Sequence, residues 1–196
     1  MFLKLQCISD DILAESLSYF RKDYIKSLKN KPTFSESISA RYLISQRIGM
    51  NYMPSENEVG IPVYTDENYW SLSHKKDLLF VWVSDTCIWV DVEINKSRDQ
   101  SVLDIFSEKE YELLGSRNWE NFYVLWTATE SLLKYNRDKK YIEWQYKLQE
   151  KQDIDMNISW IDFTLKLIFE RNRVHYTTFS NIKGNIIYSI SCKINE

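Results

Sequence analysis

The sequence predicts an α+β fold, a pseudo-two-fold pair of similar halves that each pack helices on a small antiparallel sheet. Segments whose apolar residues recur at helical spacing are followed by segments in which apolar and polar residues alternate. This order occurs twice along the chain, so each half can cover one sheet with its own helices. We place the halves at residues 1–95 and 96–196 and expect the active site in the cleft between them.

The composition is that of a folded chain. It has 196 residues, 44% of them hydrophobic, with seven Trp and thirteen Tyr. A net charge of −3 offers no basic surface for nucleic acid. No apolar run approaches the length of about 20 residues that a membrane helix needs. The first residues are too few and too soon charged to form a signal peptide, so neither a membrane nor an export route is expected.

Cysteines and glycines narrow the kinds of site that the chain can build. Cys7, Cys87 and Cys192 lie far apart and form no C-x-x-C pair, so neither a structural zinc site nor a disulfide framework is expected. This usage is typical of a reduced, cytoplasmic protein. The four glycines are too dispersed for a Walker loop or a dinucleotide fingerprint. A phosphate ligand would therefore be held by side chains and a metal ion.

The helices of the first half follow a short strand at residues 2–8. A helix is predicted over residues 11–27 and a second over 35–49, with a break at Pro32. The end of the first helix is basic and includes Lys26, Lys29 and Lys31. These lysines either complement the helix dipole on a solvated face or reach a ligand phosphate. Arg41, on the second helix, has the fork of donors that suits phosphate.

The strands of the first half follow a loop and a short extended piece at residues 61–64. Residues 78–84 and 86–95 are predicted to form an antiparallel hairpin with a turn at 85–86. His74 would lie at its near end beside Ser73 and Lys75, as a polar cluster. By itself this histidine is more typical of an ordinary surface or core position.

The second half is predicted to begin with short helices at residues 101–106 and 107–114. Ser107 and Glu110 have the spacing of a capping box. A longer helix is predicted over residues 119–135, followed by a solvated helix and loop over 137–157. Three alternating segments then predict strands at residues 160–170, 174–180 and 185–193, with a turn at Gly184 between the last two.

Two carboxylates share one face of the predicted strand 86–95. Asp91 and Glu93 are two residues apart, so they point to the same side with Trp89. Like charges held this close repel unless a cation lies between them, and Mg²⁺ prefers such oxygen ligands. In isolation the pair is more typical of a half-exposed strand whose acids face water.

A third carboxylate lies on the predicted helix 119–135. Trp126, Glu130 and Lys134 follow one another at intervals of four residues and share a helix face. Glu130 and Lys134 alone would be interpreted as an exposed ion pair worth about 0.3–0.5 kcal/mol. The motifs elsewhere in the chain suggest a different role.

Five motifs occur in order between residues 60 and 134. Together they resemble the 4′-phosphopantetheinyl transferase superfamily, and they are most similar to its longer, monomeric branch, the surfactin-synthetase-activating type. The family pattern is G-x-P, S-H, G-[VI]-D-[VI]-E, F-x-x-x-E and W-[ST]-x-K-E-[SA]-x-x-K. The matching stretches are Gly60–Pro62, Ser71–His74, Val90–Glu93, Phe106–Glu110 and Trp126–Lys134.

The resemblance implies a reaction and a partner. The phosphopantetheine arm of coenzyme A is transferred to a serine of an apo acyl or peptidyl carrier protein. Asp91, Glu93 and Glu130 would hold Mg²⁺, with Mn²⁺ as a second possibility. Glu130 or a metal-bound water would be the base. The remaining residues implied in catalysis or coenzyme A binding are Lys134, His74, Ser73, Lys75, Arg41, Lys26 and Lys29.

The chain departs from the family pattern at four places. Thr129 stands where the family has Lys, Trp89 replaces the Gly before the acidic pair, and Ile61 replaces a residue that is often basic. No Gly-x-Gly follows Lys134. These departures leave open a second hypothesis, an inactive family member that binds carrier protein or coenzyme A. For an acidic carrier protein we expect a docking patch at Lys96, Arg98 and the helix 105–114.

Overall fold

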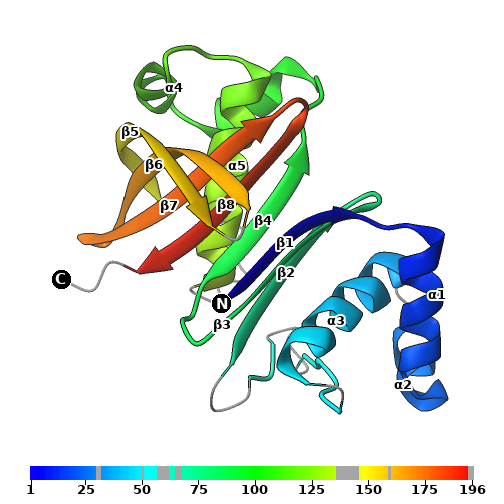
Figure 1. Ribbon diagram of the computed structural model, residues 1–196. Helices are drawn as coiled ribbons and strands as arrows, with labels where there is room; N and C mark the ends of the chain where they lie inside the picture. The colour runs from blue at the N-terminus through cyan, green and yellow to red at the C-terminus, as the bar shows by residue number, and fades with distance from the viewer. Residues whose placement is uncertain are drawn as a thin grey trace. The chain divides into compact units, whose positions relative to one another are not determined.

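A computed structural model of the protein describes residues 1–29, 32–49, 51–56, 62–64, 68–135, 146–158 and 160–193 (Figure 1). The fold is mixed α+β with two antiparallel sheets, as predicted. The chain forms two compact units, Met1–Cys87 and Ile88–Glu196. The strand with Asp91 and Glu93 therefore belongs to the second unit, whereas our boundary at residue 95 had placed it in the first.

The first unit builds a three-stranded sheet of order β1-β3-β2. Its longest helix, α3, packs Ala40, Leu43 and Ile44 against Leu79 and Val81 of the central strand. The apolar spacing that predicted the helix 35–49 is thus the spacing of its buried face. The elements of this unit are β1 (Phe2–Cys7), α1 (Asp10–Tyr19), α2 (Lys22–Leu28), α3 (Phe34–Ile48), β2 (Tyr69–Lys75) and β3 (Leu78–Ser84).

The single helix predicted over residues 11–27 is wrong, because the chain leaves the helical conformation between α1 and α2. Phe20 and Arg21 are extended, with ψ angles of 147° and 151°. The break buries Phe20 in a cluster with Leu28 and Ile38. Tertiary burial of one aromatic side chain therefore overrides a continuous helical pattern, which contains no proline to mark the break.

The second unit builds a five-stranded antiparallel sheet of order β4-β8-β7-β6-β5. Helix α5 has the predicted bounds, and the predicted capping box of Ser107 and Glu110 is confirmed at α4. The elements are β4 (Trp89–Ile94), the 3-10 helix η1 (Gln100–Ile105), α4 (Glu108–Leu114), α5 (Trp119–Tyr135), β5 (Lys147–Ile158), β6 (Ile161–Arg171), β7 (Val174–Lys183) and β8 (Ile186–Lys193).

Two strand predictions are corrected. The hairpin predicted between residues 78–84 and 86–95 does not form: β3 is paired on both edges, with β1 and β2, and β4 pairs with β8 instead. The solvated helix and loop predicted over residues 137–157 contains a strand, β5, from Lys147 onward. Its polar composition reflects an edge strand with many exposed side chains, because among the described strands it pairs with β6 alone.

The two units share an order of elements. In each, the first strand is followed by helices, and it then lies antiparallel beside the last strand: β1 beside β3 and β4 beside β8. In each, the longest helix packs against this last strand. Among the helices of the described residues, none is long and apolar enough to cross a membrane.

Candidate functional site

The two acids of β4 point toward α5. Asp91 lies directly opposite Ser189 of β8, so both side chains are on the same face of the sheet. Ser189 in turn contacts α5, since its hydroxyl lies 2.7 Å from the hydroxyl of Thr127. Alternation along β4 puts Glu93 on this face as well. The two acids of β4 therefore lie on the sheet face that α5 covers. This is the face on which the predicted site would bring them together with the acid of the helix.

Small hydroxyl side chains line the contact between α5 and the sheet. Thr127 bonds to Ser189, and Ser189 lies 2.8 Å from Ser180 of β7. A second chain joins Ser131 to Ser191 and then to Thr178. All are buried, and short side chains allow a helix to lie close to a sheet. This network was missed, although the i, i+4 spacing of Thr127 and Ser131 and the alternation of Ser189 and Ser191 are visible in the sequence.

Lys134 joins α5 to the edge strand. Its ammonium donates to Asp91 Oδ1 at 2.7 Å and to the carbonyl oxygen of Val90 at 3.0 Å. The side chain of Asp91 is only 9% exposed, whereas that of Lys134 is 29% exposed. Of the predicted site residues, Asp91 and Lys134 are therefore in direct contact, 43 positions apart in the chain.

Glu130 lies one helical turn before Lys134 and in the field of the same groups. Burial, and next the charge of Asp91, raise the pKa of Glu130 from 4.5 to about 7; Lys134 opposes this rise and Glu93 adds to it. Within the described residues its carboxylate accepts no hydrogen bond and forms no ion pair. Among the described residues, three carboxylates of the site thus lie near the ammonium of Lys134.

The donor chemistry of this cluster suits a hard divalent cation, because all three acids offer oxygen ligands. Among the described residues, however, no group of three or more His, Cys, Asp or Glu side chains is already arranged to hold a metal ion. The ammonium of Lys134 lies on Asp91 Oδ1. A metal ion would have to use the other oxygen of Asp91 or displace this ammonium.

Two of the four departures from the family pattern are buried beside the site. Trp89 lies opposite Ser191 on the same face as Asp91 and is 5% exposed. Thr129 is fully buried, and its hydroxyl has no hydrogen-bond partner among the described residues. A lysine at position 129 would place its charge in this interior, and burying a charge is unfavourable. The buried environment of position 129 therefore suits threonine and not the lysine of the family pattern.

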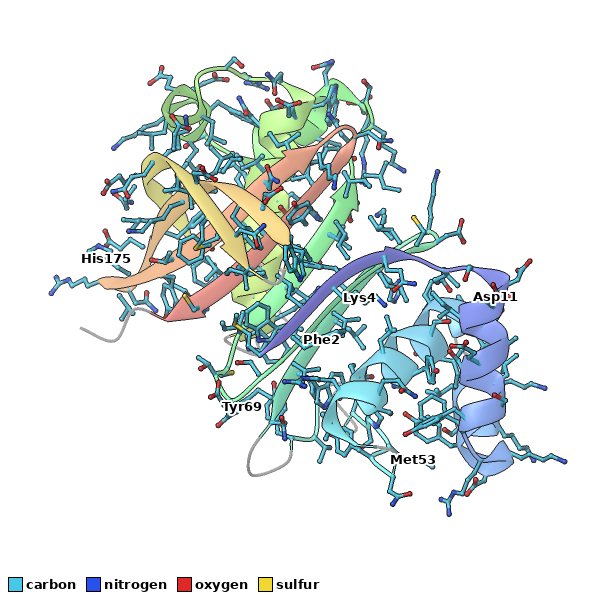
Figure 2. All side chains as sticks on the ribbon, in the orientation of Figure 1. Phe2, Lys4, Asp11, Met53, Tyr69 and His175 are labelled. Carbon is cyan, nitrogen blue, oxygen red and sulfur yellow. The ribbon has the colours of Figure 1, made fainter. Side chains whose placement is uncertain are left out.

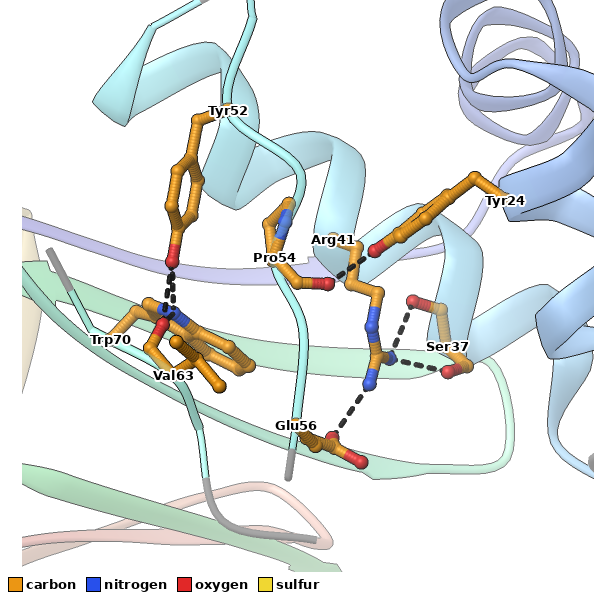
Figure 3. A network of polar contacts seen from close by, with 8 residues as sticks. All are labelled: Tyr24, Ser37, Arg41, Tyr52, Pro54, Glu56, Val63 and Trp70. Atoms are coloured by element: carbon orange, nitrogen blue, oxygen red, sulfur yellow. Dashed lines mark hydrogen bonds and ion pairs between the residues drawn. The ribbon is translucent and has the colours of Figure 1, made fainter. Parts of the chain in front are cut away.

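Arg41 in the first unit is the centre of a separate polar network (Figure 3). The residue is 2% exposed. Its guanidinium donates to the carbonyl oxygen of Ser37 at 3.2 Å and to Glu56 Oε1 at 2.6 Å. Nearby, Tyr24 donates to the carbonyl oxygen of Pro54, and burial raises the pKa of Tyr24 to about 12. The residue predicted to meet a phosphate is therefore buried and paired with an acid.

The other predicted residues of the first unit are dispersed. Ser73 and Lys75 lie on one face of β2 and His74 on the opposite face, beside Leu72 and Trp70, so the three do not form one cluster. Lys26 and Lys29 are exposed on α2 and at its end. Lys31, Gly60 and Ile61 lie outside the described residues.

The expected docking patch has mixed charge. Lys96 and Arg98 are exposed, and Arg98 also donates to the hydroxyl of Tyr123 at 2.9 Å. Helix α4 instead presents Glu108 and Glu112 to solvent. Glu110 of this helix is internal: it accepts from the backbone N–H groups of Ser107 at 2.9 Å and Leu148 at 3.2 Å. The F-x-x-x-E stretch thus has a structural role as cap and anchor.

Compared with models of protein families and with curated proteins, the sequence matches none.

Proposed function

We propose that the protein transfers the 4′-phosphopantetheine group of coenzyme A to a serine of an apo acyl or peptidyl carrier protein. The observation that supports this most directly is the cluster on β4 and α5, in which Lys134 contacts Asp91 and both influence Glu130. In the binding of a metal-bound pyrophosphate, carboxylates hold the metal ion and an ammonium contacts a phosphate oxygen. This cluster offers both kinds of group. The ordered motifs from Gly60 to Lys134 support the same reaction.

The chemistry assigns a task to each group. The serine Oγ forms a bond to the phosphorus that carries the pantetheine arm, and the bond from that phosphorus to the bridging oxygen breaks. Adenosine 3′,5′-bisphosphate leaves with the bridging oxygen. The serine proton needs an acceptor, and a carboxylate placed beside the nucleophile can act as the general base. We assign this role to Glu130.

Lys134, whose ammonium reaches from α5 to β4, would neutralise charge on a phosphate oxygen. Asp91, Glu93 and Glu130 would be the protein ligands of Mg²⁺ or Mn²⁺, which when bound would offset the charge of the pyrophosphate. Contacts of coenzyme A with residues of the first unit, His74 above all, are part of the proposal. So is the pseudo-two-fold pairing of two halves around a cleft.

Mass spectrometry of an intact carrier protein tests the proposal. An apo acyl carrier protein incubated with this protein, coenzyme A and Mg²⁺ should gain the mass of one phosphopantetheine. The gain should be lost on chelation and in Glu130→Gln and Asp91→Asn. Glu120→Gln, an exposed acid in the first turn of the same helix, is the matched control and should retain full activity. No mass gain with any of several carrier proteins would overturn the transferase.

The second candidate, a family member that binds coenzyme A or carrier protein without turnover, is favoured by one observation. The ammonium of Lys134 neutralises Asp91 where a metal ion would be needed. Calorimetric titration with coenzyme A, with and without Mg²⁺, separates the candidates. Binding that is independent of Mg²⁺, together with an unmodified carrier protein, would support this second function.

A further inference from the structure

A cavity of about 460 Å³ lies in the first unit, against β1 and the helices α1 and α3. Phe2, Lys4 and Gln6 alternate along β1 and so share the face that lines it. Phe2 and Lys4 can be followed on this strand in Figure 2. Helix α3 packs against β3 and β2, and the cavity lies beside this contact. Its volume is in the range of about 300–1,000 Å³ typical of small-molecule sites.

The charged groups of the cavity favour an anion. Lys4 and Arg47 both line it, and neither forms an ion pair with the residues that the structure describes. Glu15 is the one acid among the described residues that line it, and this carboxylate accepts a hydrogen bond from the hydroxyl of Tyr42 at 3.0 Å. Two cations against one acid leave a single positive charge, which matches a monoanion.

The remaining lining specifies the rest of the ligand. Phe2 and Leu43 belong to the apolar cluster between α3 and the sheet and offer hydrocarbon surface. Gln6 Oε1 is buried and accepts no hydrogen bond from any described residue. A buried acceptor without a partner is costly, and a ligand that donates an N–H or O–H to it would recover that cost.

We infer that this cavity binds a small amphipathic organic acid: a monoanionic head at Lys4 and Arg47, an apolar body on Phe2 and Leu43, and a donor for Gln6. The inference is independent of the proposed transferase, because no residue of the cavity belongs to the cluster on β4 and α5. It adds a second ligand site, on the first unit, to the protein.

A pair of fluorescent probes tests the inference directly. The dye 8-anilinonaphthalene-1-sulfonate carries a monoanionic sulfonate, an aromatic body and an N–H donor. N-phenyl-1-naphthylamine has the same rings and N–H without the sulfonate. In a titration of the full chain the sulfonate should saturate one site and bind at least about tenfold more tightly than the neutral dye, as a charge-assisted hydrogen bond predicts. Equal affinity of the two dyes would overturn the inference.

Substitutions locate the site. Lys4→Met and Arg47→Met should each weaken sulfonate binding about three- to tenfold and leave binding of the neutral dye unchanged. Glu15→Gln should tighten sulfonate binding, because it removes the acid that opposes the anion. Lys22→Met, an exposed lysine of α2 outside the cavity, is the matched control. Arg47 is exposed on α3, so its variant is expected to fold even if a change in β1 is not tolerated.

Competition extends the test from sulfonate to carboxylate. Decanoate should displace the dye, and methyl decanoate, which has the same acyl chain and likewise no donor for Gln6 but carries no charge, should displace it at least about tenfold less well. Sulfonate binding that is unchanged in Lys4→Met, Arg47→Met and Glu15→Gln would show that the dye occupies another surface, and the inference would fail.

Discussion

Each unit contains an ion pair that joins its longest helix to another segment, and the two pairs differ in charge balance. Arg41 in the first unit faces one acid, Glu56, and is held by Ser37 as well; its side chain is 3% exposed. Lys134 in the second unit contacts Asp91 and lies in the field of Glu130 and Glu93; its side chain is 29% exposed. Among the described residues, Arg41 thus has one acid beside it and Lys134 has three. The more exposed partner is the acid Glu56 (25%) in the first pair and the cation Lys134 (29%) in the second.

This difference distinguishes a structural ion pair from a candidate ligand site. A balanced buried pair has little to gain from a further ion, whereas surplus carboxylates near one ammonium favour an added cation or a proton. The β4 and α5 cluster, in which three carboxylates of the described residues lie near the ammonium of Lys134, is therefore the candidate ligand site, although both helices carry residues that the resemblance implicated.

The largest expected effect comes from breaking the balanced pair. Arg41→Met should lower the free energy of unfolding by about 3 kcal/mol, because it removes the buried guanidinium that pairs with Glu56 and donates two hydrogen bonds to Ser37. Urea denaturation measures this change. Arg21→Met removes an exposed pair with Asp23 and should cost less than about 0.5 kcal/mol. A stable Arg41→Met that only loses coenzyme A affinity would make Arg41 a ligand residue instead.

Removing the cation of the second pair should lower the free energy of unfolding by a smaller amount. Mg²⁺ should partly offset this loss. Lys134→Met removes the ammonium that contacts Asp91 and lowers the pKa of Glu130, and we expect a loss of about 2 kcal/mol in the free energy of unfolding at pH 8. Millimolar Mg²⁺ should restore part of this loss, because the ion would take the place of the ammonium. Thermal unfolding with Mg²⁺, and with choline chloride at matched ionic strength, checks the result. Equal responses to the two salts would argue against a metal site.

A smaller effect follows from the raised pKa of Glu130. Between pH 4.5, its ordinary pKa, and about 7 the folded state binds a proton that the unfolded state has released. The contribution of Glu130 to stability is therefore present at low pH, falls as the pH rises through this window, and is constant above it. Because the group is partly open to solvent, we expect about 1 kcal/mol. Glu130→Gln should remove this slope from denaturation measured between pH 5 and 8.

Helix bounds set by local spacing could be predicted from the sequence. Strand partners and the helix break, which depend on segments far apart in the chain, could not. The bounds of α5 follow from apolar periodicity. Asp91, Glu130 and Lys134 are expected as site residues only through the resemblance, because their spacing alone is also typical of solvated charges. The pairing of β4 with β8 joins Asp91 to Ser189, and no local pattern specifies such a partner. The break at Phe20 likewise depends on Leu28 and Ile38, which lie later in the chain.

Each charged neighbour of Glu130 influences its pKa separately. Asp91 raises its pKa more than Glu93 does, and Lys134 lowers it. Carboxyl-carbon NMR titrations of Glu130 should therefore show a larger fall in its pKa for Asp91→Asn than for Glu93→Gln, and a further rise for Lys134→Met. Glu120→Gln, on the exposed first turn of α5, should leave the titration unchanged. If Glu93→Gln had the larger effect, Glu93 rather than Asp91 would be the nearer acid, and the cluster would be centred one side chain further along β4.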